Sequence, residues 1–328
     1  MIKGFFILLM VCLMSDCASV QEENYRVIES YKQLSGIQVL DATGKVTIPL
    51  SKQGYTLHLP GSYPDATIIM LSGASLDTTR DLDEFEIIQP ALEKNIAVLF
   101  VSTGKVIEFL FTDQDIRIID EIIHRASAKY HLEEKPIYLL GMSLGGTMAL
   151  RYHEYCALGK SAYGHQVDAL AICDAPLDMT RLWHEQDQAL KNNFHPNAVG
   201  EARWVMHFLQ ENLGGSPSEA LESYIAYSPF VYRDEQKRKI DLFKDIPIRM
   251  YHEPDIEWWI KNRGKDYNTI NSVDLAGFYN ALIQAGNANV ELITSYNKRK
   301  GFEEGSSPHT WTIVDNEEMV EWLLEVVK

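Results

Sequence analysis

A Gly-Met-Ser-Leu-Gly pentapeptide at residues 141–145 holds the side chain best suited to do chemistry, the hydroxyl of Ser143. The apolar run before it, residues 135–140, predicts a strand, and residues 146–152 after it predict a helix. A Gly-x-Ser-x-Gly sequence in that setting predicts a nucleophile elbow, a turn so tight that a side chain at its flanking glycines would collide with backbone. The hydroxyl would then stand exposed above a sheet, with the amide of Leu144 pointing at a reacting oxygen. The pattern therefore predicts an acyl-transfer site at Ser143.

The composition of the chain limits its partners. The 328 residues are 46% hydrophobic, and 30 Lys and Arg stand against 46 Asp and Glu, a net charge of −16. Because the sequence holds no Lys- or Arg-rich run, we expect neither nucleic acid nor an anionic membrane surface as a partner. We expect a small-molecule or carbohydrate ester as the substrate, and neither a bound cofactor nor a metal ion.

The first 19 residues are typical of an export leader. A short basic start is followed by 11 apolar residues at 4–14, too few to span a bilayer, and then by small residues. We expect a signal peptide over 1–19 and a secreted, periplasmic or envelope-anchored product. The leader also resembles a bacterial lipoprotein signal with a lipid anchor at Cys17, although Asp16 stands where a small residue is expected; cleavage near Ala18 or Ser19 is the alternative. No other segment is long and apolar enough to span a membrane.

Apolar runs alternate with helical patterns through the rest of the chain. This alternation predicts an α/β fold with a mostly parallel, doubly wound sheet. Segments 44–50 and 55–60 predict an antiparallel N-terminal edge, joined by a turn at Gln53 and Gly54. The further expected strands are 66–71, 96–101, 137–140, 167–173, 246–252 and 290–294, and the expected helices include 81–94, 113–130 and 316–327.

Residues 176–236 interrupt the alternation with helical patterns only, near 180–191, 200–212 and 217–227. A segment of this length between two core strands predicts a helical cap over the sheet. We therefore expect residues 20–328 to form a single domain with a cap inserted at about 176–236. The two cysteines inside that domain, Cys156 and Cys173, are expected to be free thiols rather than a disulfide.

From about residue 44 onward the chain resembles the α/β-hydrolase superfamily, and within it the prolyl-oligopeptidase-like and polysaccharide-esterase-like serine esterases. The pentapeptide at 141–145 carries the resemblance, together with paired strands at 55–72 and a helix and strand at 272–294. It implies the α/β-hydrolase fold and a carboxylesterase that acts on acylated carbohydrate or aryl esters through an acyl-enzyme. A serine aminopeptidase or dipeptidyl-peptidase-like enzyme is one alternative, and a non-catalytic binding module on the same fold is another.

The resemblance also implies a catalytic triad in the chain order serine, acid, histidine. His309 follows the last expected strand and would be the base. Asp255 follows strand 246–252 and is the favoured acid. Glu253, two residues away, is an alternative, and so is Asp174, because some members of the fold place the acid after the preceding strand.

Two backbone amides would hold the oxyanion of the reaction. One is the amide of Leu144 in the elbow. The other is expected in the loop after strand 66–71, where Gly73 allows a turn that aims the amide of Ala74 inward.

Overall fold

The computed structural model describes residues 25–34, 38–39, 46–47, 52–71, 85–105 and 109–327. Two predictions lie outside these residues. One is the leader at 1–19 with its possible lipid anchor at Cys17, and the other is the loop that carries Gly73 and Ala74. Both stay predictions.

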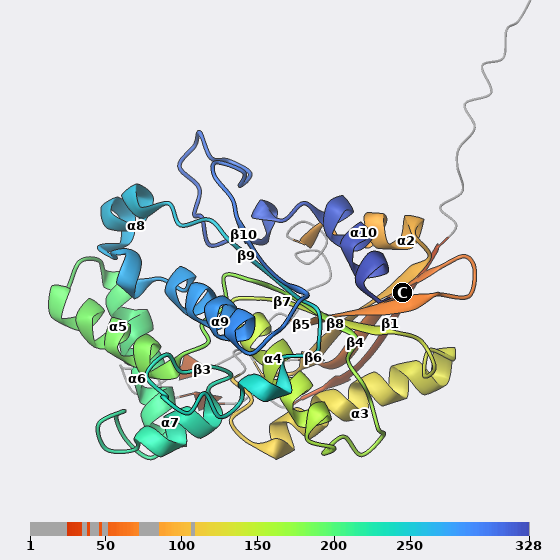
Figure 1. The fold of residues 1–328 in the computed structure, drawn as a ribbon, viewed down its shortest axis with the longest axis horizontal. Helices are drawn as coiled ribbons and strands as arrows, with labels where there is room; N and C mark the ends of the chain where they lie inside the picture. The colour runs from red at the N-terminus through yellow and green to blue at the C-terminus, as the bar shows by residue number, and fades with distance from the viewer. Residues whose placement is uncertain are drawn as a thin grey trace, which may run out of the picture.

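Eight of the described strands form one sheet in the order β1-β4-β6-β5-β7-β8-β9-β10 (Figure 1). The strands β5 to β10 run parallel to one another, whereas β4 is antiparallel to both β6 and β1. A mostly parallel sheet with an antiparallel N-terminal edge is therefore confirmed. The strands are β1 (Tyr25–Gln33), β4 (Lys52–Pro60), β5 (Ala66–Leu71), β6 (Ile96–Thr103), β7 (Ile137–Met142), β8 (Ala169–Cys173), β9 (Ile248–His252) and β10 (Val290–Thr294).

The sequence pattern gave β4 the wrong edge partner. Segment 44–50 was expected to pair with 55–60, but β4 pairs along its whole length with β1. Residues Val46–Thr47 (β3) instead pair with Gln38–Val39 (β2) in a separate two-stranded sheet. The edge strand β1 mixes partly buried and exposed positions. It therefore lacks the continuous apolar run that marks the inner strands.

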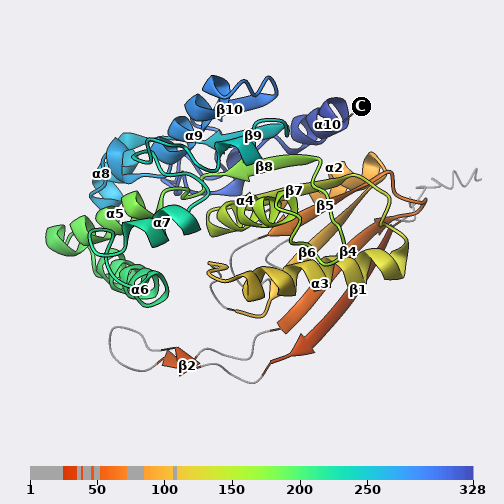
Figure 2. The same cartoon turned by 60° about the horizontal axis from the view of Figure 1, so that its bottom comes forward.

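Helices cover both faces of the sheet (Figure 2). Alternate residues of each inner strand face opposite layers: Ile69 and Leu139 pack under α3, α4 and α9, while Ile68 and Leu140 pack under α2 and α10. Because both faces are covered, these strands are buried at every position, which explains their unbroken apolar sequences. The helices are α3 (Asp113–Tyr130), α4 (Leu144–Ala157), α9 (Ser272–Gln284), α2 (Ile88–Glu93) and α10 (Asn316–Val326).

Three helices lie between β8 and β9, as the helical patterns predicted: α5 (Met179–Asn192), α6 (Pro196–Leu213) and α7 (Leu221–Tyr227). They gather at one end of the sheet beside α8 (Ile256–Arg263), away from the edge formed by β1 (Figure 2). Buried side chains such as Leu182 and Leu209 give them an apolar cluster of their own. Short 3₁₀ turns occur at Ile240–Leu242, Tyr267–Thr269 and Trp311–Ile313.

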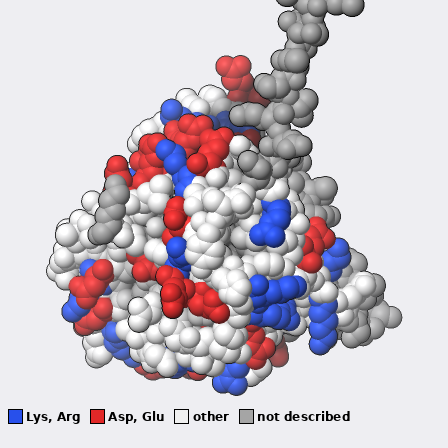
Figure 3. All heavy atoms as spheres, turned by 90° about the vertical axis from the view of Figure 1, so that its right-hand side faces the viewer, with Lys and Arg blue, Asp and Glu red and all other residues white. Residues whose placement is uncertain are grey.

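Acidic and basic side chains are interspersed on the face shown in Figure 3, without a continuous basic stripe among the residues drawn in colour. Within the described ranges, none of the helices is both long and apolar enough to cross a membrane.

Leu139 offers a test of the central packing, because it is fully buried in the strand that leads to Ser143. Leu139→Ala should lower the free energy of unfolding by about 2–5 kcal/mol, through lost apolar burial and the cavity left behind. Urea denaturation followed by circular dichroism measures it. The matched control is Leu158→Ala, at a side chain that is 50% exposed; equal losses in the two variants would contradict this account of the core.

Candidate active site

Ser143 lies in a strained turn between β7 and α4. Its φ of 54° and ψ of −128° are unusual for a residue with a side chain, and such conformations cost about 1–3 kcal/mol. The turn is also tightly packed, because a Cβ on Gly141 would lie 2.3 Å from the backbone of Gly145. The predicted elbow is therefore present, and the flanking glycine is there because backbone occupies the space of a side chain.

His309 reaches Ser143 from the loop between β10 and α10. Its Nε2 lies 3.0 Å from Ser143 Oγ, within hydrogen-bond distance. The backbone amide of His309 donates to the Ser307 hydroxyl at 3.2 Å, which helps to hold the loop. The structure thus brings together the two residues that the sequence proposed as nucleophile and base.

Asp174 completes the hydrogen-bonded chain. Its Oδ2 lies 2.5 Å from His309 Nδ1, on the opposite side of the ring from Ser143. Asp174 follows β8 directly and has a left-handed φ of 42°; Asp is one of the few non-glycine residues that tolerate this region. Its backbone amide donates to the Tyr251 carbonyl at 2.9 Å, so the neighbouring strand β9 fixes the start of the loop.

The carboxylate of Asp174 sets the protonation of His309. Burial disfavours the imidazolium, but the charge and hydrogen bond of Asp174 outweigh burial, so the pKa of His309 lies above its ordinary value. Lys265 opposes this shift in the pKa and Glu201 supports it. The imidazole side chain is 30% exposed, so solvent limits the size of the shift.

The structure corrects the favoured acid, because Asp255 does not contact the imidazole. Its Oδ1 accepts from the backbone amide of Trp258 at 3.0 Å as the N-cap of α8, and its Oδ2 accepts from Arg299 at 2.8 Å. Glu253 is also committed elsewhere: it is buried, pairs with Arg299 and accepts from the amide of Lys298 at 2.9 Å. Asp174, named as an alternative, holds the position that was assigned to Asp255.

One of the two amides that were predicted to bind an oxyanion, that of Leu144, lies among the described residues. Leu144 is the first residue of α4, so its N–H is among those at the helix N-terminus that have no acceptor within the helix. The partial positive charge of that helix end favours an anion there. Ala74, the second predicted donor, lies outside the described residues.

A cavity of about 560 Å³ opens above Ser143 and His309. Residues of α5 and α6 line this cavity, together with Trp259, Arg263, Lys265 and residues 269–271. Of the tryptophans, Trp204 and Trp259 line this cavity, whereas Trp311 is fully buried in the core. The cavity is within the size range of small-molecule binding sites.

Charged side chains also line the cavity, and no motif in the sequence indicated them. Glu185 is buried and binds Lys265 at 2.5 Å and Arg181 at 2.7 Å, so these charges compensate one another. Glu201 and Arg263 line the same cavity. The pocket is therefore partly aromatic and partly charged.

The described part of the chain contains no group of three His, Cys, Asp or Glu side chains that could hold a metal ion. Cys156 and Cys173 are not joined by a disulfide, as expected; Cys156 is partly buried and Cys173 is buried.

No family model matches the chain, and no curated protein sequence matches it. Solved structures do. An esterase of Pyrococcus furiosus is 14% identical with a TM-score of 0.51, and the match covers 91% of this chain and 92% of the esterase. The acylaminoacyl peptidase of Pyrococcus horikoshii is 12% identical with a TM-score of 0.52; the match covers 92% of this chain and 44% of the peptidase.

A bifunctional GH43-CE protein of Bacteroides eggerthii is 17% identical with a TM-score of 0.51. The match covers 84% of this chain but 36% of that protein, so this chain spans about a third of its length. The chain has the α/β-hydrolase fold. Within this fold, Ser143 occupies the turn after a central strand, and His309 and Asp174 reach it from two separate loops.

The geometry predicts which carboxylate controls the histidine. Asp174→Asn should lower the pKa of His309, because it removes the charge that raises it and leaves the opposing effect of burial. A titration followed by nuclear magnetic resonance of the imidazole measures this pKa. Asp255→Asn is the matched control, since that carboxylate binds Arg299 and an amide of α8. A larger fall in the control than in Asp174→Asn would contradict the assignment.

Proposed function

We propose that this protein is a serine carboxylesterase in which Ser143 is the nucleophile, His309 the general base and Asp174 the residue that orients the base. One observation carries the proposal: a continuous hydrogen-bonded chain from Asp174 through both ring nitrogens of His309 to Ser143, opening on a cavity. Esterases among the structural neighbours support it.

In the proposed reaction, Ser143 Oγ attacks the ester carbonyl carbon and gives its proton to His309 Nε2. Asp174 keeps the Nδ1 proton of His309 facing itself, so that Nε2 is free to accept. The carbonyl oxygen becomes an oxyanion that faces the amide of Leu144. The tetrahedral intermediate then collapses, His309 donates its proton to the departing alkoxide, and an acyl-enzyme remains on Ser143. A water molecule, deprotonated by His309, hydrolyses that acyl-enzyme by the same steps and releases the acid.

Acylated carbohydrate and aryl esters are the substrate classes that we propose. The mixture of aromatic and charged side chains in the cavity suits a ring that carries hydroxyl groups. A carbohydrate ester also agrees with the presence of a GH43-CE protein among the neighbours, which is a likeness in fold only.

A peptidase is the second candidate. Glu201 lines the cavity and lies near enough to His309 to influence its pKa. A carboxylate at that place could hold the amino terminus of a peptide. The resemblance in fold to an acylaminoacyl peptidase agrees with it.

We also propose that the activity is exported, on the strength of the leader pattern at 1–19. Sequencing the amino terminus of the mature protein would test this and would show whether Cys17 becomes the first residue.

Fluorophosphonate labelling tests the nucleophile. The wild-type protein should be labelled at Ser143 and should hydrolyse p-nitrophenyl acetate. Ser143→Ala should show neither labelling nor hydrolysis, while its circular dichroism spectrum stays the same. Peptide mass mapping locates the adduct. Hydrolysis by Ser143→Ala at the wild-type rate would exclude the mechanism, and absence of labelling in the wild type would favour a binding module. Acylated sugars, aryl esters and aminoacyl amides assayed side by side separate the esterase from the peptidase.

The role proposed for Asp174 predicts a loss of rate when its charge is removed. Asp174→Asn should lower kcat by about 10³–10⁴, since an amide favours the wrong tautomer of His309. Because His309 must be neutral to accept a proton, kcat/KM of the wild type should fall as the pH drops through its raised pKa. Asp255→Asn should keep kcat within a few-fold of the wild type. Equal losses of kcat in the two variants would refute the role given to Asp174.

A further inference from the structure

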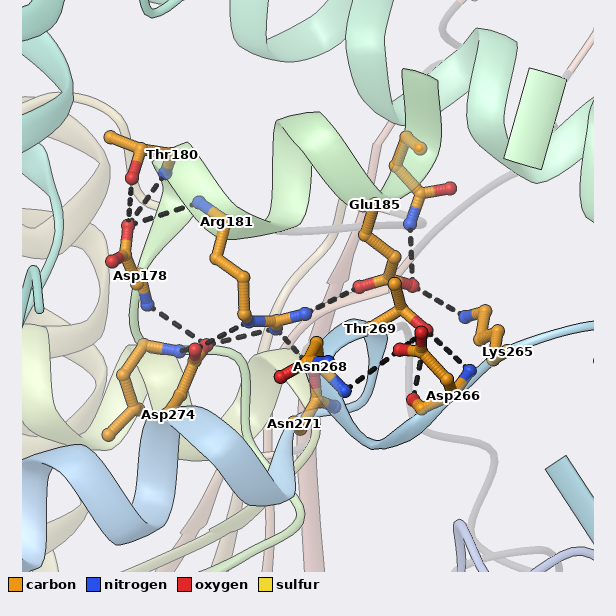
Figure 4. Close-up of polar contacts among 12 residues, drawn as sticks. Asp178, Thr180, Arg181, Glu185, Lys265, Asp266, Asn268, Thr269, Asn271 and Asp274 are labelled. Atoms are coloured by element: carbon orange, nitrogen blue, oxygen red, sulfur yellow. Dashed lines mark hydrogen bonds and ion pairs between the residues drawn. The ribbon is translucent and has the colours of Figure 1, made fainter. Parts of the chain in front are cut away.

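Asn271 bonds the main chain of the proposed acid from a different part of the fold. Its side-chain Nδ2 donates to the backbone carbonyl of Asp174 at 2.9 Å. Its Oδ1 accepts from Arg181 at 3.0 Å, which fixes the orientation of the amide group (Figure 4). The residue just before α9 is thereby joined to the loop that follows β8.

Arg181 is itself held rigidly from two sides. It reaches from α5 to Asp274 in α9, with Nε and Nη2 donating to the two carboxylate oxygens at 2.5 and 2.9 Å, and it binds Glu185 at 2.7 Å (Figure 4). Such a bidentate pair fixes both the place and the plane of the guanidinium. The Arg181 side chain is 13% exposed and that of Asp274 is 2% exposed.

Asp274, the partner of Arg181, also binds the loop after β8, a few residues beyond Asp174. Asp274 Oδ2 accepts from the backbone amides of Leu177 at 2.9 Å and Asp178 at 3.1 Å. Asp178 in turn caps α5. The loop 174–178 is therefore tied to the start of α9 at both of its ends.

These ties matter because Asp174 is strained. Its left-handed backbone costs free energy and persists only when its surroundings hold it. The hydrogen bond from Asn271 ends on the carbonyl of Asp174 itself, so it acts against relaxation of that residue. Relaxation would carry the carboxylate away from the Nδ1 atom of His309.

We propose that Asn271 is a positioning residue for the reaction, acting through Asp174: its amide holds the strained peptide that aims the carboxylate at His309. The inference rests on the proposed function only for its effect on rate, since the contact between Asp174 and His309 can be observed without turnover. Asn271 also lines the cavity, so a change in KM alone would not be diagnostic.

The charges around the pair define the expected pH effect. Asp174, Lys265 and Glu201 face His309, and His252 faces Asp174. Asn271 is neutral, so replacing it with a neutral residue leaves these charges in place. A fall in the pKa of His309 in such a variant would then report that the Asp174 carboxylate has moved.

The test uses Asn271→Ala, with Asn271→Leu as a variant of similar size in case the smaller side chain disturbs folding. At a pH high enough for His309 to be neutral, the rate of fluorophosphonate labelling should fall about tenfold in both variants. This loss is smaller than the loss of about a hundredfold that a 1 Å misplacement can cause. The midpoint of labelling against pH should move to lower pH. Asn268→Ala, at an exposed amide on the same loop, is the matched control and should leave both quantities unchanged.

Two outcomes of the labelling experiment would overturn the proposal. One is labelling of both Asn271 variants at the wild-type rate and midpoint. Another is a lower labelling rate that is fully explained by a smaller fraction of folded protein, measured by thermal unfolding, while the midpoint of labelling against pH stays unchanged. If the wild type is not labelled at all, the proposed function fails instead. The downfield proton resonance of His309 Nδ1 then decides: its loss in Asn271→Ala supports the positioning role, and its persistence there overturns it.

Discussion

The site depends on the register between two neighbouring parallel strands. Met142 of β7 lies opposite Cys173 of β8, and the amide of Ser143 donates to the Cys173 carbonyl at 2.9 Å. The next residue on each strand is therefore the proposed nucleophile on one and its proposed acid on the other. Both residues turn into backbone conformations with positive φ. If one of these strands slipped by one residue, its side chains would turn to the opposite face of the sheet while those of the other strand stayed in place, and the two groups would no longer meet.

The elbow could be predicted from sequence because everything that defines it is local. A buried strand, two glycines in contact with backbone and a helix all lie within about 20 residues, and His309 followed from its place after the last strand. The acid was predicted wrongly, because two carboxylates occupied equivalent positions after neighbouring strands. What separates them is a contact partner distant in sequence: Arg299 holds Asp255, and no local pattern reveals that ion pair.

One local feature does distinguish Asp255 from Asp174. Asp255 stands immediately before a helical segment, where Asp commonly caps a helix through its side chain, and that is its place in the structure.

The edge strand β1 was not predicted, for a different reason. One of its sides pairs with β4, and no other described strand lies beside its second side, so its alternation of partly buried and exposed residues is too weak to mark it as a strand.

The placement of Asp174 after β8 separates two tasks that the predicted arrangement would have joined. Had the acid followed β9, the segment from Glu253 to Lys265 would have carried both an acid and part of the pocket wall. Instead, that segment is anchored by Arg299, and two residues of α8, Trp259 and Arg263, line the cavity. Neither side chain takes part in the hydrogen bonds that join Asp174, His309 and Ser143. On the proposed function, substitutions at these two positions are therefore expected to change the choice of substrate rather than the reaction.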